Sequence, residues 1–93
     1  MKKLLSVIIP AYKQGKTIRR DLENIEKVLN KGLIDTRYEI ICVVDGLVDK
    51  TFEEAKKARC KHLRVLSYTY NQGKGYAVRF GMARAKGDLI SFL

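Results

Sequence analysis

Short apolar runs alternate with segments of helical periodicity along the whole chain, and this alternation limits the fold more than any other feature. Four runs are rich in aliphatic and β-branched residues, at positions 4–10, 38–45, 63–68 and 89–93. Each run is long enough for a strand and too short for a helix, and each lacks the strict alternation of a half-exposed strand. The runs therefore predict strands that are covered on both faces.

The segments between these runs predict three helices. Apolar side chains recur at helical spacing from Ile18 to a stop near Gly32. Residues 49–51 can cap a second helix, and a third is expected over residues 74–86, ended by Gly87. Three small residues share one face of the third helix: Ala77, Gly81 and Ala85. The β-α-β-α-β-α-β order predicts an α/β fold, with a parallel sheet, right-handed crossovers and helices on its faces.

Length and charge set broad limits on function. The chain has 93 residues, enough for a single domain over 1–93, and its 46% hydrophobic content argues against disorder. The formal charge of +9 favours anionic partners such as nucleic acid, nucleotide phosphates or an acidic membrane surface, although a solvated basic surface is equally compatible. The apolar run near the amino terminus is too short for a signal peptide, and no segment resembles a membrane span, so a cytoplasmic chain is expected.

One candidate function is nucleoside-triphosphate binding. Residues 10–17 read PAYKQGKT, follow a predicted strand and end in Gly-Lys-Thr, as a phosphate-binding loop does. Pro10, however, occupies the first position, where glycine is expected. Because proline has no N–H to offer a phosphate, this position counts against the interpretation.

A second candidate is a small basic RNA-binding domain. Residues 74–80 read KGYAVRF and are similar to an RNA-contacting strand motif. As a strand this segment would place Tyr76, Val78 and Phe80 on one face, but valine stands where an aromatic residue should stack on a base. The order of predicted elements also differs from the β-α-β-β-α-β order of that domain.

The third candidate draws on all four strand ends. The chain contains, in this order, SVIIPAYKQGKTI, YEIICVVDGLVDKT, NQGKGYAVRFGMARAKGD and LISFL. Together these segments resemble the N-terminal nucleotide-binding portion of family-2 glycosyltransferases, inverting enzymes with the GT-A fold, and in particular those that load a sugar onto dolichyl or other polyprenyl phosphate. The resemblance implies a Rossmann-like, GT-A type sheet in the order 3-2-1-4, incomplete relative to the full fold, and transfer of a sugar from a UDP- or GDP-linked donor.

The resemblance implies nucleotide contacts at six positions: Pro10, Ala11, Tyr12, Gln14, Asp45 and Lys74. Asp45 can accept a hydrogen bond from a ring N–H of the base, and Tyr12 can offer a flat wall. Lys74 lies between two glycines at a helix start, where its charge and the helix dipole would both attract a diphosphate. Each also has an ordinary alternative, because Asp45 can simply end a strand and Lys74 can belong to a turn.

The sequence also departs from the family. Gln14 replaces the usual glutamate, which changes a carboxylate contact into an amide contact, and Leu47 and Val48 replace the usual serine and threonine. In the family an Asp-x-Asp motif after the fourth strand holds Mg²⁺ or Mn²⁺, which offsets the charge of the leaving diphosphate. No acidic residue follows residue 88, so we expect no catalytic residue and no metal ligand in this chain.

These observations lead to one expectation for the whole molecule. We expect the nucleotide-binding part of a glycosyltransferase, truncated or paired with a second polypeptide and inactive alone. Its partners would be a UDP- or GDP-linked sugar and an acceptor that can be a lipid phosphate, with no nucleic acid. Its location would be cytoplasmic, with peripheral contact at the inner membrane face.

Overall fold

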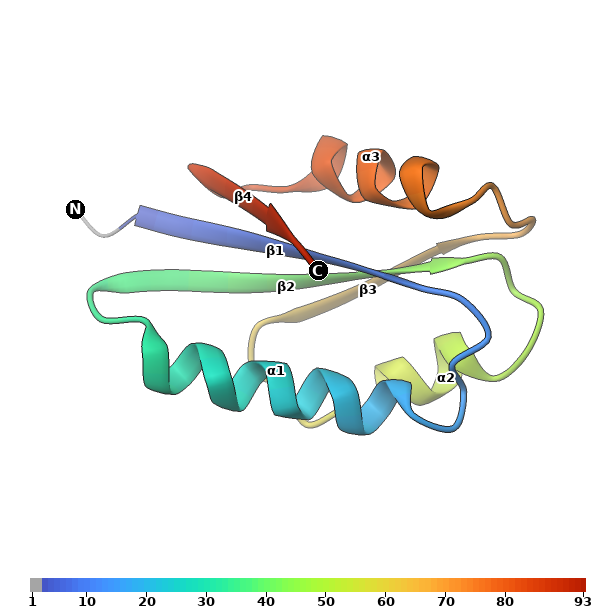
Figure 1. Cartoon of the computed structure of the whole chain (residues 1–93), viewed down its shortest axis with the longest axis horizontal. Helices are drawn as coiled ribbons and strands as arrows, with labels where there is room; N and C mark the ends of the chain where they lie inside the picture. Colours follow the sequence, from blue (N-terminus) through green and yellow to red (C-terminus); the bar gives the residue numbers. More distant parts are fainter. Residues whose placement is uncertain (1–2) are drawn as a thin grey trace.

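The computed structural model describes residues 3–93 as a sheet covered by helices on both faces (Figure 1). Strands and helices alternate as expected: β1 Lys3–Ala11, α1 Ile18–Gly32, β2 Thr36–Asp45, α2 Thr51–Lys56, β3 Leu63–Tyr68, α3 Lys74–Arg84 and β4 Leu89–Phe92. All neighbouring strands pair in parallel, and the strand order is β3-β2-β1-β4. This confirms the predicted α/β class and the order 3-2-1-4. None of the described helices is long and apolar enough to cross a membrane.

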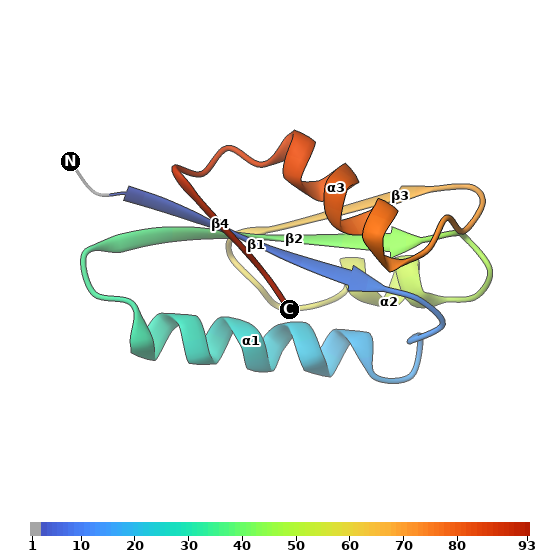
Figure 2. The ribbon, with the colours of Figure 1, turned by 45° about the horizontal axis from the view of Figure 1, so that its top comes forward.

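The helices divide between the two faces of the sheet. Figure 2 shows α1 and α2 beneath the strands and α3 above them. Because side chains alternate along a strand, Val7 and Ile40 point towards α1 and α2, whereas Ile8, Ile41 and Val43 point towards α3. The core therefore has two layers that share β1 and β2, and the near-continuous apolar runs of these strands reflect burial on both sides.

Helix α3 packs very closely on the sheet through its small residues. A Cβ added to Gly81 would lie 2.7 Å from Ile8 Cγ2 and 3.0 Å from Val43 Cγ2. Ala77 is fully buried against the same strands. The predicted small-residue face is therefore confirmed for Ala77 and Gly81, whereas Ala85 lies beyond the end of α3. These two residues seat the amino terminus of α3 beside the carboxyl ends of the strands.

Two expectations about the end of the chain were wrong. Strand β4 was expected to be covered on both faces, but all four of its residues are exposed, because β4 lies at the edge of the sheet beyond the helices. Helix α3 was expected to reach residue 86 and stop at Gly87, but it ends at Arg84, and Ala85 is already extended. Gly87 instead allows a close approach, since a Cβ there would lie 2.5 Å from Ser6 Oγ.

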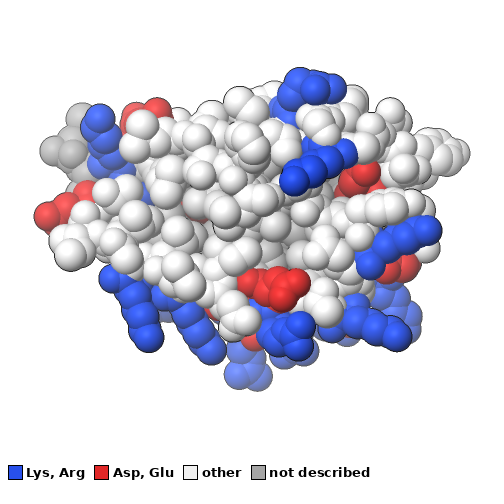
Figure 3. Space-filling model, in the orientation of Figure 1, with Lys and Arg blue, Asp and Glu red and all other residues white. Residues whose placement is uncertain are grey.

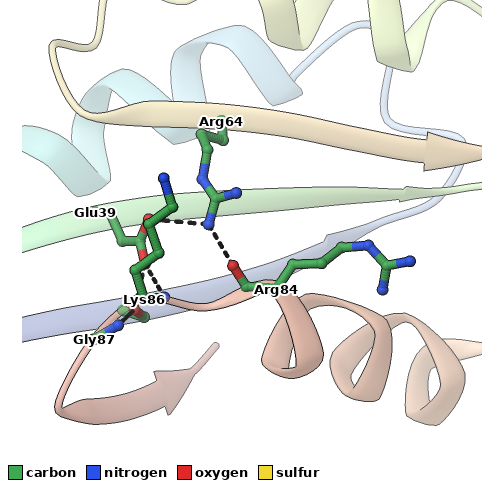
Figure 4. A network of polar contacts seen from close by, with 6 residues as sticks. Glu39, Arg64, Arg84, Lys86 and Gly87 are labelled. Atoms are coloured by element: carbon green, nitrogen blue, oxygen red, sulfur yellow. Dashed lines mark hydrogen bonds and ion pairs between the residues drawn. The ribbon is translucent and has the colours of Figure 1, made fainter.

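The connection between α3 and β4 is fixed to the sheet by a polar network (Figure 4). The carboxylate of Glu39 on β2 accepts hydrogen bonds from Ser6 Oγ at 2.6 Å, from Lys86 N at 2.8 Å and from Arg64 Nη2 at 3.1 Å. Arg64 also donates to the carbonyl of Arg84 at 2.6 Å. One carboxylate thus joins β1, β2 and β3 to the segment that leads into β4.

Candidate functional site

Three loops lie at the carboxyl ends of the strands, where the first and the third of them border a cavity together with the end of β2. They are residues 12–17 after β1, residues 46–50 after β2 and residues 69–73 after β3. The cavity has a volume of about 390 Å³ and is lined by Pro10, Ala11, Tyr12, Gln14, Asp45, Asn71, Gly73, Lys74 and Leu93. All six positions that the sequence predicts as nucleotide contacts are therefore brought together around one cavity.

Pro10 and Ala11 form the end of β1 and one wall of this cavity. They are still paired with Val43 and Val44 of β2. Leu93 N donates a hydrogen bond to the Ile8 carbonyl at 3.0 Å. Backbone groups two residues apart on a strand point to the same neighbouring strand, so those of Pro10 also face the β4 side. They lie beyond the last β1–β4 pair, which joins Ile8 and Phe92. A missing N–H at Pro10 therefore removes no ladder hydrogen bond.

The turn after β1 is held by its own side chains and by α2. Tyr12 N donates to Gln14 Oε1 at 3.1 Å, and Gln14 N donates to the hydroxyl of buried Thr51 at 2.8 Å. Thr17 N and Ile18 N both donate to the Gln14 carbonyl, at 3.0 and 2.8 Å. These amides are already engaged within the protein, whereas a phosphate-binding loop needs converging free N–H groups. The nucleoside-triphosphate interpretation of residues 10–17 therefore fails on geometry.

Asp45 ends β2 and is almost fully buried, with 4% of its surface exposed. Its Oδ1 accepts hydrogen bonds from Tyr68 Oη at 2.6 Å and Gln72 N at 2.7 Å, and its Oδ2 accepts one from Gly73 N at 3.0 Å. Burial alone would raise the pKa of Asp45, but these three hydrogen bonds outweigh it and hold the pKa below its ordinary value. The carboxylate is therefore ionised at neutral pH and rigidly oriented.

The hydrogen bonds of Asp45 leave one acceptor position for a ligand. A carboxylate oxygen carries two lone pairs, and Oδ2 has a single protein donor. Because Asp45 lines the cavity, this oxygen can accept a hydrogen bond from a bound molecule. Asp45 thus organises the loop after β3 and also presents a negative acceptor to the cavity.

Lys74 begins helix α3 at the mouth of the cavity. Gly73 precedes it with a φ of 96°, a conformation that glycine adopts without strain. The first hydrogen bond of the helix runs from Ala77 N to Gly73 O. The backbone N–H groups before Ala77 therefore have no carbonyl acceptor within the helix. The Lys74 ammonium and these N–H groups make this the positive side of the cavity.

The conformation of residues 74–80 also tests the RNA-binding interpretation, which requires this segment to be a strand. Residues 74–84 form α3, so Tyr76, Val78 and Phe80 do not share a strand face. Tyr76 and Phe80 instead pack with Tyr68 in an aromatic cluster, with ring centroids 5.1 and 5.0 Å from that of Tyr68. The stacking surface that an RNA-binding strand would offer is absent from this segment.

Several residues of the site were not predicted, among them Tyr68, Thr51 and Asn71. Tyr68 is the last residue of β3 and pairs with Asp45, the last residue of β2. Aligning the ends of the two predicted strands would therefore have placed Tyr68 beside Asp45. Thr51 is also anchored by Asp49, whose carboxylate accepts the Thr51 N–H at 2.9 Å. Asn71, expected only to fix a turn, lines the cavity, and its N lies 2.7 Å from where a Cβ on Gly46 would be.

The residues around the cavity do not fit a metal ion. Within residues 3–93, no three His, Cys, Asp or Glu side chains are grouped closely enough to bind one. Among the residues that line the cavity, Asp45 is the one carboxylate, and three hydrogen bonds leave it a single acceptor position. Lys74 adds a positive charge to the same cavity. The chemistry of this donor set therefore suits a polar organic ligand with an anionic group.

Comparison with known proteins agrees with this geometry. The sequence profile of "Glycosyl transferase family 2" matches residues 6–93. The dolichyl-phosphate beta-glucosyltransferase of Drosophila melanogaster is 38% identical over 95 residues, an alignment that covers 95% of this chain and 29% of that protein. The chain thus spans less than a third of the length of this relative.

Solved structures share the same arrangement of strands and helices. Glucosyl-3-phosphoglycerate synthase from Mycobacterium tuberculosis, in complex with Mn²⁺, UDP and phosphoglyceric acid, has a TM-score of 0.72 and 28% identity, over 98% of this chain and 32% of that one. The mannosyltransferase PcManGT from Pyrobaculum calidifontis, in complex with GDP-Man and Mn²⁺, has a TM-score of 0.74 at 22% identity, over 97% of this chain and 26% of that one, which supports the fold alone. The family match extends over nearly the whole chain, and this protein belongs to glycosyl transferase family 2.

Proposed function

We propose that this chain binds the nucleotide of a nucleotide-diphospho-sugar and forms the donor-binding part of an enzyme that transfers the sugar to an acceptor. The observation that carries the proposal is the convergence of Tyr12, Asp45 and Lys74 on one cavity at the carboxyl ends of parallel strands. Ligands of open α/β sheets bind at this place. A planar wall, a fixed acceptor and a positive helix start are together suited to a base, a ribose and a diphosphate.

Each residue would contribute a different interaction. Asp45 Oδ2 would accept the ring N–H of the base, because that oxygen has a free lone pair and its carboxylate is held ionised. The ring of Tyr12 would pack against the base, and the Gln14 amide would reach the ribose. Lys74 and the first N–H groups of α3 would bind the diphosphate and stabilise negative charge on it as the sugar leaves.

The proposed donor is UDP- or GDP-linked, and the proposed acceptor is a polyprenyl phosphate. The UDP in the Mycobacterium structure and the name of the Drosophila relative support these two classes. A lipid acceptor would bring the site to a membrane surface. The Mn²⁺ of the solved structures would need carboxylates beyond those that line this cavity, so we expect the 93-residue chain alone to bind nucleotide without transferring sugar.

Calorimetric titration with uridine, UDP and GDP tests the proposal on the 93-residue chain. We expect a nucleoside diphosphate to bind weakly, with Asp45→Asn reducing the affinity for both uridine and UDP. Lys74→Gln should reduce the affinity for UDP while leaving that for uridine unchanged, because the lysine faces the diphosphate. Lys27→Gln on the exposed side of α1 is the charge-matched control.

Two results would contradict the proposal. Equal UDP affinity in the parent, Asp45→Asn and Lys74→Gln proteins would remove this cavity as the nucleotide site. Metal-dependent transfer of sugar by the chain alone would show that it holds catalytic residues which we do not place in it.

A further inference from the structure

The three loops that follow β1, β2 and β3 share one surface composition. Each combines at least one lysine with an exposed apolar or aromatic side chain. The pairs are Tyr12 with Lys13 and Lys16, Leu47 and Val48 with Lys50, and Tyr70 with Lys74. We call residues 12–17, 46–50 and 69–74 together the loop surface.

The apolar members of the loop surface are exposed although they belong to ordered loops. Leu47 and Val48 are 50% and 49% exposed, and Tyr70 is 77% exposed. The two loops that carry them are joined by a hydrogen bond from Leu47 N to Thr69 O at 3.1 Å. Gly46 lies against Asn71 N, as the 2.7 Å approach of its virtual Cβ shows. These exposed side chains therefore belong to two loops that are held against each other.

The charge of the loop surface is strongly positive. Its three loops contain four lysines and one aspartate, so they carry +3 of the formal charge of +9. Lys13, Lys16 and Lys50 also line a second cavity of about 450 Å³ between the first two loops. In Figure 3 the right-hand end, where these loops lie in Figure 1, carries blue and white side chains next to one another, with some red among them.

The negative groups nearby do not cancel this charge. Asp49 is hydrogen bonded to the N–H and hydroxyl of Thr51, so it is directed towards the start of α2. Glu54, which also lines the second cavity, is paired with Lys57 at 3.0 Å. The lysines of the loop surface are therefore available to an external anion.

We propose that the loop surface docks on a membrane of anionic lipids. Exposed leucine and valine flanked by lysines match such a membrane, because the aliphatic groups can enter the interfacial region while ammonium groups contact lipid phosphates. Tyrosine is favoured at the same depth. A nucleic acid would attract the lysines equally, but it offers little to the aliphatic pair Leu47 and Val48.

Docking in this orientation would turn the mouth of the nucleotide cavity towards the membrane. Tyr12 and Lys74 belong both to the cavity and to the loop surface. This consequence depends on the proposed function, since it would place a bound donor beside a lipid-linked acceptor. The docking itself depends only on the composition and exposure of the three loops.

Vesicle flotation of the 93-residue chain tests the docking. Vesicles of equimolar phosphatidylcholine and phosphatidylglycerol should bind the chain, and vesicles of phosphatidylcholine alone should not. The double variant Leu47→Ser/Val48→Ser should lower the partition coefficient about tenfold through lost burial. The double variant Lys16→Gln/Lys50→Gln should lower it about 25-fold, at about fivefold for each lysine.

Matched controls lie at the other end and on the outer side of the molecule. Ile34 is 82% exposed in the turn between α1 and β2, so Ile34→Ser removes an aliphatic group of similar size without touching the loop surface. Lys27→Gln/Lys31→Gln removes two charges from α1. Both controls should float like the parent chain, and unchanged circular dichroism should show that each variant is folded.

The outcomes separate this inference from the proposed function. Loss of flotation in the loop variants, with unchanged UDP affinity and unaffected controls, supports membrane docking. Equal losses in loop and control variants would overturn it, because they would indicate attraction by net charge alone. Single-stranded RNA that displaces the chain from vesicles, and that loses affinity in the lysine variants only, would assign the surface to nucleic acid. Flotation without any UDP binding would contradict the proposed function and leave the docking intact.

Discussion

The hydroxyl of Tyr68 donates a 2.6 Å hydrogen bond to the Asp45 carboxylate across the last pair of the β2–β3 ladder. This contact fixes the one carboxylate among the residues that line the cavity. The same carboxylate accepts the N–H groups of Gln72 and Gly73. Through Asp45, Tyr68 therefore sets the path of the loop that leads to Lys74.

Tyr68→Phe should weaken both stability and nucleotide binding. The variant removes a hydrogen bond to a charged group, which costs about 1.5–3 kcal/mol of unfolding free energy. The freed carboxylate would rotate, and we expect UDP affinity to fall about tenfold in calorimetry. Tyr70→Phe is the matched control, because the Tyr70 ring is exposed. A Tyr68→Phe protein with unchanged UDP affinity would show that Asp45 is oriented by the loop amides alone.

Gly46→Ala should disturb the site more than its size suggests. Gly46 has a φ of 92°, and a Cβ there would lie 2.7 Å from Asn71 N, a backbone atom. The strained conformation alone costs about 1–3 kcal/mol, and the clash would push the loop after β3 away from the cavity. Thermal unfolding and UDP titration should both report the change. Gly32→Ala, which meets nothing within 4 Å at the end of α1, should leave both unchanged or raise stability slightly.

Lys13→Asn should stabilise the protein. Lys13 has a φ of 51°, a left-handed conformation that asparagine and glycine tolerate better than lysine. We expect a gain of about 0.5–1 kcal/mol, seen as a higher urea midpoint with an unchanged m-value. Lys13→Val should act in the opposite direction, since β-branched residues are least tolerant of this backbone. A loss of stability in Lys13→Asn would show that the lysine side chain itself supports the turn.

Acid should destabilise the fold through Asp45 and Glu39. Burial would raise the pKa of each carboxyl, but hydrogen bonds outweigh it and lower both pKa values in the folded state. A lowered folded-state pKa stabilises the protein above the unfolded-state pKa, near 4, and this stabilisation is lost as the pH falls through the folded-state pKa. Urea unfolding from pH 7 down to pH 3 should therefore show falling stability, with a shallower slope in Glu39→Gln. A steeper slope in that variant would contradict this assignment.

The sequence predicted the fold well because burial on both faces has a plain signature. The runs around Val7 and Ile41 are apolar without alternation, and helix α1 was bounded correctly between Ile18 and Gly32. The run over residues 89–93 carries the same signature, yet β4 is exposed. The hydrophobic pattern of a strand indicates whether its side chains can be buried. It does not indicate which other elements are present to cover them.

The candidate site was predictable at the level of the loops but not of their contacts. The rule that ligands bind at the carboxyl ends of parallel strands led to Tyr12, Asp45 and Lys74, which line one cavity. Tyr68 and Thr51 were missed because their roles depend on register and on loop packing, which join residues far apart in the sequence. The contributions of Tyr12, Asp45 and Lys74 as ligand contacts stay predictions.

The bare edge strand β4 has a consequence for handling the protein. Leu89, Ile90 and Phe92 are exposed on both faces of a strand whose outer edge has no partner among the described residues. Such an edge is a template on which another chain can add a strand. Concentrated preparations should therefore form oligomers that persist in high salt and that a charge placed at Ile90 would prevent.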